Sequence, residues 1–447
     1  MKRARMATTD HSPLKAASLL LLVAIVLIAP RHAAAQPPQR VTILYTSNTN
    51  GIMRSCHCAG NLFGSLPQRA RFIRAVREKG TPVLLVDAGD LFPAGNDGLK
   101  AQYIAKCYAL MGYDAIGIGE RELACGTAFL QALIAEERLP FTSANINARD
   151  THQPLVAPVI TRNLAGTTIG IVSIISPRAF SVQTVPLPTD VEILPAKAEL
   201  EKQLARLKGK ADLNILLSHL GLAADREIAR TVPGIDVVVG AHSGEALQAP
   251  LRVNNTLIVQ AGKNTEYVGV LELALRPVEL LTHRLAPLID LIPDDKETAR
   301  IASEYRAARF RAFRTRARKP TPKALSRFVP SQACRKCHQE QYKAWAKTKH
   351  AHAFRVLKEK GRAGDSECYT CHTTGSGMET GFVTPAETPQ FVGVHCQCCH
   401  LVDATHGDNK QHVIPSAPIV PDTCIGCHNA FNSPKFDYTS YRARIRH

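Results

Sequence analysis

Four Cys-x-x-Cys-His motifs lie within 95 residues of one another near the C-terminal end of the 447-residue chain. Two thiols three positions apart can form thioethers with the two vinyl groups of one haem, and the adjacent histidine then reaches the iron as an axial ligand. A single motif would also fit half of a zinc ribbon, but zinc does not need a histidine after every cysteine pair. The pattern therefore predicts four covalently bound haem c groups. The attachment residues are Cys334, Cys337 and His338; Cys368, Cys371 and His372; Cys396, Cys399 and His400; and Cys424, Cys427 and His428.

Nine of the 13 cysteines and ten of the 17 histidines lie in residues 331–447. So many cysteines in a short segment could also indicate a disulfide scaffold. The four motifs account for eight of the nine, however, and leave only Cys398. We therefore exclude the disulfide scaffold and expect Cys398 to be an unreactive thiol.

Each haem iron has a second axial face, for which the same segment offers six further histidines. Two histidine ligands suit fast electron transfer, whereas an open face suits the binding of a small molecule. Both remain open from the residues alone. The candidate distal ligands are His350, His352, His395, His406, His412 and His447.

The segment from about residue 330 to 447 resembles the tetrahaem cytochrome c-554 type domain. The resemblance rests on the first motif with the following Tyr342, Trp345 and His350, on residues 393–406, and on the ending from Asn432 to His447. It implies a mainly α-helical shell with little strand around stacked haems that relay electrons. It also implies distal ligation by the Trp-x-x-x-x-His element and by downstream histidines, which favours His350, His406 and His447 in that role. Leu-Val-Asp at 401–403 departs from the Gly-Pro-Gly that is common in the family.

Residues 40–285 must form a separate unit, because short apolar segments alternate there with helical patterns. Such alternation predicts an α/β layered domain with a buried sheet. Strands are expected at Val41–Tyr45, Val83–Val86, Ala115–Ile118, Thr168–Ile174, Leu213–Leu217, Val237–Val239 and Leu257–Gln260. Helices are expected at Leu66–Arg77, Lys100–Met111, Thr127–Glu137 and Ala196–Leu207.

Residues 41–275 resemble the catalytic domain of 5′-nucleotidases, within the calcineurin-like metallophosphoesterases. The matching segments include 86–90, 113–119, 217–221 and 236–242. The resemblance implies a two-sheet sandwich flanked by helices. It also implies two metal ions held by Asp, His and Asn ligands, with a bound hydroxide as the nucleophile.

Several of the family's metal ligands are replaced in this chain. Asn48 and Asn50 stand at the Asp-x-His motif, and Glu120 and Arg121 replace the metal-binding Asn and the catalytic His. Gly244 ends the Gly-His-x-His motif. We therefore do not expect dinuclear phosphoesterase activity, because an arginine in this position would repel a second cation.

Asp90, His219 and His242 remain, and Cys56 and Cys58 follow the altered first motif. Together these five residues could hold one divalent metal ion. The two cysteines are equally compatible with a redox thiol pair or with a structural disulfide.

The N-terminus combines basic residues, an apolar run of about 14 residues and Ala33–Ala35. This is the layout of a cleavable signal peptide, and the run is short for a membrane span of roughly 20 residues. The alternative is an uncleaved anchor. We expect export to the periplasm or another extracytoplasmic site. The predicted organisation is a signal peptide at 1–35, the nucleotidase-like domain at 36–285, a basic linker with a helix at 286–330, and the tetrahaem domain at 331–447.

The formal charge of +17 suggests at first a protein that binds nucleic acid. Residues 300–330 alone carry ten basic groups against Glu304, so most of the excess lies in this short segment and in the leader, and it is not spread evenly over the chain. We therefore do not expect nucleic-acid binding. The basic segment, with a helix at Ile301–Arg318, either lies against the haem domain or an anionic redox partner, or is a solvated linker.

The sequence predicts an exported tetrahaem cytochrome that transfers electrons between redox partner proteins, with the nucleotidase-like domain as a binding or docking module. One alternative is an oxidoreductase that acts on a small substrate at an open haem or at Cys56 and Cys58. The other is a metal-dependent, 5′-nucleotidase-like phosphohydrolase.

Overall fold

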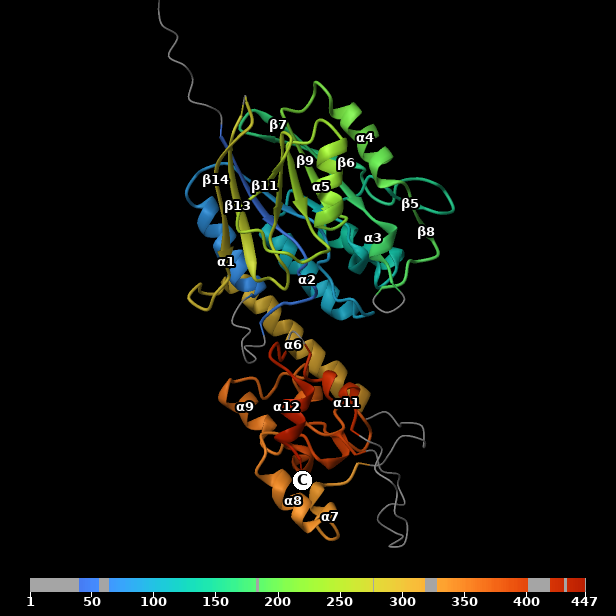
Figure 1. Ribbon diagram of the computed structural model, residues 1–447, viewed down its shortest axis with the longest axis vertical. Coiled ribbons are helices and arrows are strands. Elements are labelled where there is room, and N and C mark those ends of the chain that lie inside the picture. The colour runs from blue at the N-terminus through green and yellow to red at the C-terminus, as the bar shows by residue number, and fades with distance from the viewer. Residues whose placement is uncertain are drawn as a thin grey trace, which may run out of the picture. The chain divides into compact units, whose positions relative to one another are not determined.

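The computed structural model describes residues 40–55, 64–181, 185–275, 277–317, 328–400, 419–429 and 432–446. Within these ranges it confirms the predicted fold class, an α/β two-sheet sandwich followed by a mainly helical region (Figure 1). None of the described helices is both long enough and apolar enough to cross a lipid bilayer. The proposed signal peptide lies outside the described residues.

Two six-stranded sheets form the N-terminal sandwich. The first sheet has the order β14-β13-β1-β2-β3-β4 and the second has the order β11-β12-β10-β9-β7-β6. The first contains β1 (Arg40–Thr46), β2 (Val83–Asp87), β3 (Ala115–Gly117), β4 (Phe141–Thr142), β13 (Tyr267–Ala274) and β14 (Glu279–Pro287). The second contains β6 (Val159–Leu164), β7 (Thr167–Ile175), β9 (Leu213–His219), β10 (Val237–Gly240), β11 (Leu251–Val253) and β12 (Thr256–Gln260). A separate two-stranded sheet pairs β5 (Ile146–Ala148) with β8 (Val191–Ile193).

Helices cover both outer faces of the sandwich. The first sheet is covered by α1 (Leu66–Arg77), α2 (Gly98–Met111), α3 (Thr127–Glu137) and the start of α6 (Lys296–Ala317). The second is covered by α4 (Ala196–Leu207), which packs on β7, and by α5 (Leu222–Thr231), which packs on β10, β11 and β12 (Figure 1). Short 3-10 helices are η1 (Glu120–Leu123) and η2 (Pro177–Ala179).

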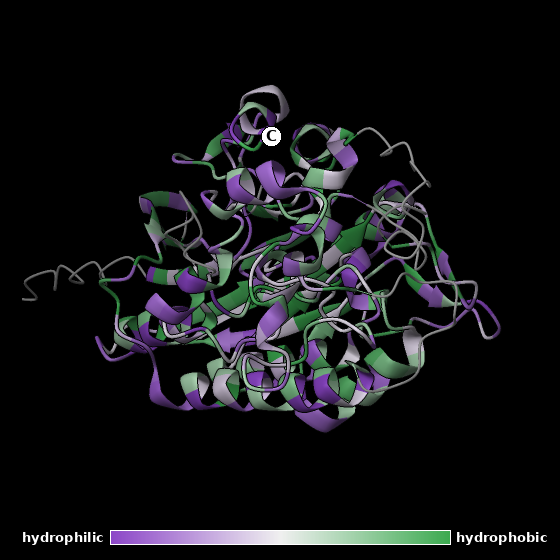
Figure 2. Ribbon diagram, turned by 90° about the horizontal axis from the view of Figure 1, so that it is seen from below, coloured by the Kyte–Doolittle hydropathy of each residue, from purple (hydrophilic) through white to green (hydrophobic). Residues whose placement is uncertain are grey.

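Alternating side chains divide the core into three layers. In β1, Ile43 and Tyr45 point between the sheets, whereas Leu44 packs under the helices. In β9, Leu217 points between the sheets and Leu216 packs against α4 and α5. This is the period-two pattern of strands buried on both faces, and Figure 2 shows hydrophobic colouring along the central strands.

Most predicted elements appear close to their expected bounds, and α1, α3 and α4 coincide with them. The helix α2 begins two residues early, at Gly98, because the Asp97 side chain accepts a hydrogen bond from the Lys100 amide and caps the helix. The helix α6 begins at Lys296, five residues before the expected start, because Asp295 caps it through Thr298.

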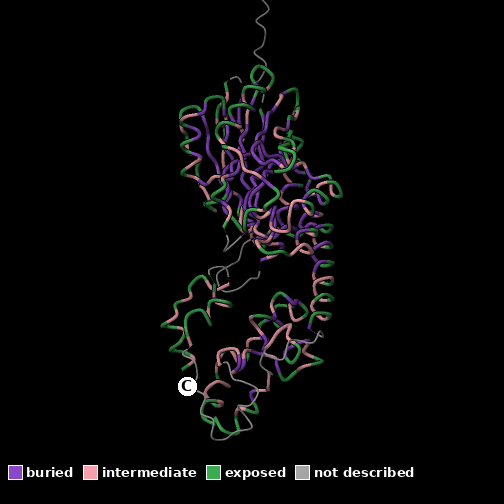
Figure 3. Tube along the Cα trace, turned by 90° about the vertical axis from the view of Figure 1, so that its right-hand side faces the viewer, coloured by how far each residue is buried: buried purple, intermediate pink, exposed green. Residues whose placement is uncertain are grey.

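The region from residue 328 onwards is built from short helices, and no strand occurs in its described part. These helices are α7 (Ser331–Cys334), α8 (Gln339–Ala346), α9 (Ala353–Glu359), α10 (Tyr369–His372), η3 (Pro389–Phe391), η4 (Cys396–Cys398), α11 (Pro421–Ile425) and α12 (Tyr438–Ala443). Its apolar cluster consists of Phe354, Leu357, Tyr369, Phe382 and Phe391. Figure 3 shows mostly intermediate and exposed residues here, in contrast to the buried strands of the sandwich.

The basic helix α6 contacts both regions. Its Arg309 pairs with Asp97 of the sandwich at 2.6 Å, and Arg314 pairs with Glu387 at 3.1 Å. Phe313 packs edge-on against Tyr369 at a ring-centroid distance of 5.5 Å. Part of the positive charge on this helix is thus paired with acidic side chains of the protein itself.

Candidate haem and metal sites

The Cys-x-x-Cys-His motifs share one local geometry. The backbone amides of His338, His400 and His428 each donate a hydrogen bond to the carbonyl of the first cysteine in their motif, at 2.8 Å. This bond closes a single helical turn, so that the two thiols and the imidazole of the motif lie close together. It is the arrangement that attachment to one haem requires.

The second motif shows how its histidine is oriented. Nδ1 of His372 lies 2.7 Å from the carbonyl oxygen of Ala353. A carbonyl only accepts, so Nδ1 must carry the proton, and the lone pair resides on Nε2. Such a bond from a ligating histidine fixes its ring and its tautomer in metal sites.

The four motifs approach one another in two pairs. The thiols of Cys334 and Cys396 are hydrogen-bonded, which joins the first motif to the third. The thiols of Cys371 and Cys427 are also hydrogen-bonded, which joins the second motif to the fourth. Haems attached at these cysteines would therefore form two close pairs.

A cavity of about 1240 Å³ lies between the second and fourth motifs. It exceeds the range of about 300–1,000 Å³ that is typical of a site for one drug-sized ligand, so it is large enough for a group of that size. Nine basic side chains line it, and the acidic residues of its described lining are Asp365 and Glu367. This excess of positive charge suits the carboxylates of haem propionates. The basic residues are Arg54, Lys100, Arg306, Lys347, Lys349, Lys360, Arg362, Arg442 and Arg444. The volume, the charge and the donor set all fit bound haem.

His350 lies close to His428, the histidine of the fourth motif, and both residues line this cavity. The ring centroids of His350 and His428 are 6.1 Å apart. Metal–nitrogen bonds of about 2 Å would place two imidazoles across one metal ion at about this separation. Burial, together with the neighbouring His428, lowers the pKa of His350, and burial also lowers the pKa of His428. Both rings are thus favoured in the neutral form that a metal ligand requires.

The other predicted distal ligands occupy different environments. His395 is buried beside Trp345, and its Nε2 lies 3.0 Å from the carbonyl of Val392. Its buried Nδ1 has no hydrogen-bond partner among the residues that the structure describes. His352 is exposed at the start of α9. His406, His412 and His447 lie outside the described residues.

In the N-terminal sandwich, three of the predicted metal ligands come together at the carboxyl ends of parallel strands. His219 ends β9, His242 follows β10, and Asp90 follows β2. Glu120 joins them from the start of η1, although the sequence treats it only as a lost ligand. Its position in the place of the family's metal-binding Asn was the signal that could have identified it.

The distances within this group are short. Nε2 of His219 lies 3.0 Å from Glu120 Oε2 and 3.6 Å from Asp90 Oδ2. Nδ1 of His242 lies 3.6 Å from the same Glu120 oxygen. Burial lowers the pKa of His219, but the Asp90 and Glu120 carboxylates raise it further, and the net result is well above its ordinary value.

Glu122 supports this group from behind. Its carboxylate accepts hydrogen bonds from the backbone amides of Asp90, Leu91 and Gly119 at 2.7–2.9 Å. Burial, with a smaller effect from the Asp90 charge, raises the pKa of Glu122 to about 8. Glu122 thus fixes the loop that carries Asp90.

The residues that replace the family's other metal ligands have structural hydrogen bonds. Asn48 accepts from the His242 amide at 3.0 Å and donates to the Gly262 carbonyl at 2.9 Å. Asn50 donates to the Asn264 side chain at 3.1 Å. These amides therefore hold loops together at the place where the family has charged or imidazole ligands.

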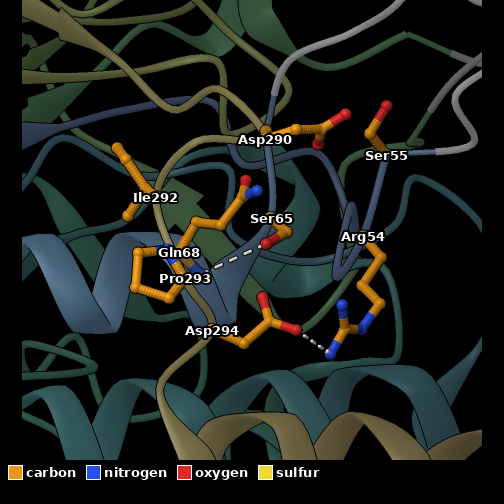
Figure 4. Close-up of a pocket in the computed structure, with 9 residues that line it drawn as sticks. Arg54, Ser55, Ser65, Gln68, Asp290, Ile292, Pro293 and Asp294 are labelled. Atoms are coloured by element: carbon orange, nitrogen blue, oxygen red, sulfur yellow. Dashed lines mark hydrogen bonds and ion pairs between the residues drawn. The ribbon is translucent and has the colours of Figure 1, made fainter.

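Cys56 and Cys58 lie outside the described residues, so their partners are not part of the geometry above. A second cavity, of about 370 Å³, is lined by residues on both sides of that segment, including Ser55 and Ser65 (Figure 4). Arg54 and Asp294 form an ion pair of 2.8 Å across it. The described residues of its lining are mostly polar and include no histidine.

Comparison with known proteins agrees with both halves of this description. Residues 333–401 match the family model described as cytochrome c554 and c-prime, a match that includes the first three motifs. Residues of the N-terminal half are 30% identical over 243 positions to snake venom 5′-nucleotidase from Gloydius brevicauda, which covers 51% of this chain and 41% of that protein. The chain spans about two-fifths of the length of the first curated relatives it matches.

Solved structures show the same fold. The 5′-nucleotidase precursor from Thermus thermophilus superimposes with a TM-score of 0.55 at 21% identity, over 72% of this chain and 68% of that one. The calcineurin-like phosphoesterase YfkN from Bacillus subtilis gives a TM-score of 0.53 at 18% identity, over 61% of this chain and 98% of that one. The chain therefore joins a 5′-nucleotidase-like, calcineurin-type α/β region to a cytochrome c554-type region, which indicates haem binding and electron transfer.

Proposed function

We propose that this chain is an exported c-type cytochrome that carries four haem groups and transfers electrons between redox partner proteins outside the cytoplasm. Its eight motif cysteines and four motif histidines hold the haems. When bound, each haem supplies an iron that alternates between the ferrous and ferric states. The observation that carries the proposal is the close approach of His350 to His428, with ring centroids 6.1 Å apart, in a cavity lined by residues of the second, third and fourth motifs.

Paired histidine ligation supports electron transfer rather than substrate binding. With two imidazoles in place, the ligand set need not change when the iron changes its charge. His350 and His428 would hold one iron between them. His352, His395, His406, His412 and His447 are the candidates for the three other irons.

The contacts between motifs support a continuous path. The contact between the thiols of Cys371 and Cys427 supports neighbouring second and fourth haems, and the contact between Cys334 and Cys396 supports neighbouring first and third haems. Three of the nine basic groups around the larger cavity are paired with carboxylates of the protein itself, namely Arg54, Lys100 and Arg362. The remaining six would neutralise propionates or attract anionic surfaces. The redox partners are therefore expected to present acidic patches.

The N-terminal region acts as a binding or docking module in this proposal and does not hydrolyse phosphate esters. Two-metal catalysis requires two cations held close together. Asn48 and Asn50 are engaged in loop hydrogen bonds, and Arg121 lies 3.3 Å from Asp90, where it adds positive charge next to the remaining ligands. These features oppose the binding of a second cation.

Potentiometric titration of the purified full-length chain, followed at the haem absorption bands, tests the proposal. We expect four reversible one-electron transitions per chain and rapid electron exchange with a small c-type cytochrome. A native high-spin haem that binds carbon monoxide would instead favour an oxidoreductase. Hydrolysis of a generic phosphate ester that is abolished in His219→Ala would contradict the non-hydrolytic role of the N-terminal region.

A further inference from the structure

The second haem-attachment motif is bonded to the N-terminal sandwich at its first residues. Glu367, the residue before Cys368, forms an ion pair of 2.8 Å with Lys100 of α2. The same Glu367 oxygen accepts a hydrogen bond of 2.8 Å from the hydroxyl of Tyr305 in α6. The Lys100 ammonium group also lies 5.9 Å from the centroid of the Tyr305 ring. Two helices of the sandwich therefore hold one carboxylate at the start of this motif.

A second set of contacts fixes the loop that precedes Cys368. Arg362 donates a hydrogen bond of 3.2 Å to the carbonyl of Ser55 in the sandwich. It also pairs with Asp365 at 2.7 Å, and Asp365 accepts a hydrogen bond of 3.1 Å from the backbone amide of Glu367. These bonds oppose any movement of the Glu367 carboxylate relative to the sandwich.

The partners of Glu367 belong to the packed part of the sandwich. Tyr305 is buried in the apolar cluster beneath the helices of the first sheet. Ala101 and Ile104, which lie on α2 next to Lys100, are fully buried in the same cluster. The Lys100 side chain itself is only 15% exposed, so water and salt screen its charge incompletely. The packing of the sandwich thus determines where this positive charge lies.

The ion pair borders the large cavity described above. Lys100 and Glu367 line it together with Cys368 and Cys371, the attachment cysteines of the second motif. Reduction of an iron by one electron removes one unit of positive charge and requires no bond to form or break. A carboxylate close to the iron therefore disfavours reduction, whereas an ammonium group favours it. The two side chains are placed to act on the same haem with opposite signs.

We propose that Lys100 and Glu367 adjust the reduction potential of the haem attached at the second motif, so that the N-terminal sandwich tunes one haem of the chain. The inference rests on the proposed function, because it requires a haem at Cys368 and Cys371. It gives the sandwich a role in electron transfer that needs neither hydrolysis nor a bound substrate. Tyr305 acts as a positioning residue, since its hydroxyl orients the carboxylate.

Potentiometric titration of the haem-loaded full-length chain and its variants tests the inference. Glu367→Gln keeps the shape of the side chain but removes its negative charge, so the potential of one haem should rise. Lys100→Met removes the positive charge, so the potential of the same haem should fall. Each change should alter the equilibrium constant for reduction of that haem by about threefold or more. The other three transitions should move less.

The double variant that combines Lys100→Met with Glu367→Gln separates charge from structural damage. Because both charges are absent, its potential should return most of the way to the wild-type value, whereas the effects of structural damage would accumulate. The matched controls are Lys106→Met, on the same helix but outside the described lining of the cavity, and Glu304→Gln, which removes an exposed carboxylate of α6. Neither control should shift a potential.

The outcomes separate this inference from the proposed function. Four haems per chain with unchanged potentials in both single variants would overturn the inference alone. Shifts in the same direction would also overturn it, because opposite charges must act with opposite signs. If Glu367→Gln does not fold, a fall in Lys100→Met supports the inference, and an unchanged or raised potential refutes it. A wild-type chain without haem would contradict the proposed function and this inference together.

Discussion

The two regions of this protein are stabilised in different ways. The sandwich buries its own aliphatic side chains in three layers, from Val41 in β1 to Leu273 in β13. The described part of the region after residue 328 has a cluster of five buried residues and a cavity of about 1240 Å³ whose lining includes cysteines and histidines. A region with so little apolar core needs another source of buried contact. The difference indicates that haem supplies the core of the second region, whereas the first folds on its own.

The strongest way to break this comparison is to prevent haem attachment. With Cys368, Cys371, Cys424 and Cys427 all changed to Ala, we expect the region after residue 328 to lose its compact fold, because the large cavity would lose its contents. The N-terminal region should remain folded. Limited proteolysis with mass spectrometry will show whether cleavage concentrates after residue 328. Cys398→Ala is the matched control and should retain all four haems and its protease resistance.

The comparison also predicts that the sandwich can be destabilised without loss of haem. Arg69 is fully buried and donates to Tyr108 at 2.8 Å and to Thr49 at 2.9 Å, while Tyr108 donates to buried Asp87 at 3.0 Å. Arg69→Met leaves Asp87 without a compensating charge and should cost about 3–5 kcal/mol of unfolding free energy. Denaturant unfolding will measure the loss. Arg71→Met, on the exposed side of the same helix, should change stability by less than about 0.5 kcal/mol. A fall in haem content of folded Arg69→Met would show that the two regions are not independent.

Within the haem region, His350→Ala should affect one haem and leave the protein folded. Removing the ring that faces His428 opens one axial face, so one of the four haems should become high-spin and bind carbon monoxide. Electron paramagnetic resonance will detect the change. Lys349→Ala, at a neighbouring position in the same cavity, should leave the spectrum unchanged. A fully low-spin spectrum in His350→Ala would exclude His350 as a ligand.

A smaller effect is the dependence of the stability of the sandwich on pH, which should arise in part from Asp225. Burial raises the pKa of Asp225 from 3.8 to about 7, although bonds from Ser218 and Gln260 oppose the shift. The folded state then binds the proton more tightly than the unfolded state, so this contribution is present below about pH 4 and is lost as the pH rises through about 7. Asp225→Asn should flatten the slope of stability between these values by up to about 1.4 kcal/mol per pH unit. Asp150→Asn, at an exposed position, should leave the slope unchanged.

Much of the fold is predictable from the sequence because the sandwich strands are continuous apolar segments. The predicted β1, β2, β7, β9, β10 and β12 appear within a residue or two of their expected bounds. The edge strand β14 escaped prediction because its residues are mostly exposed and carry polar groups such as Thr282 and His283. Which residues of β14 are buried depends on how this strand pairs with β13. That pairing cannot be predicted from the sequence of β14 alone.

The candidate sites also divide into those that the sequence reveals and those that only the fold brings together. Motif residues that act within five positions, as in Cys334–His338, are visible in the sequence because their chemistry is local. The role of Glu120 is not, because it depends on Asp90, His219 and His242 arriving from distant strands. The pairing of His350 with His428 is equally non-local, since 78 positions separate them. The sequence suggests His350 as a ligand but cannot identify its partner.

The haem content of the purified full-length chain tests the central claim most directly. A pyridine haemochrome assay, combined with the intact mass, counts the covalently attached groups. The account predicts four haems per chain and a mass increase of four haem groups. A chain with no haem and with zinc bound at the cysteines would contradict it.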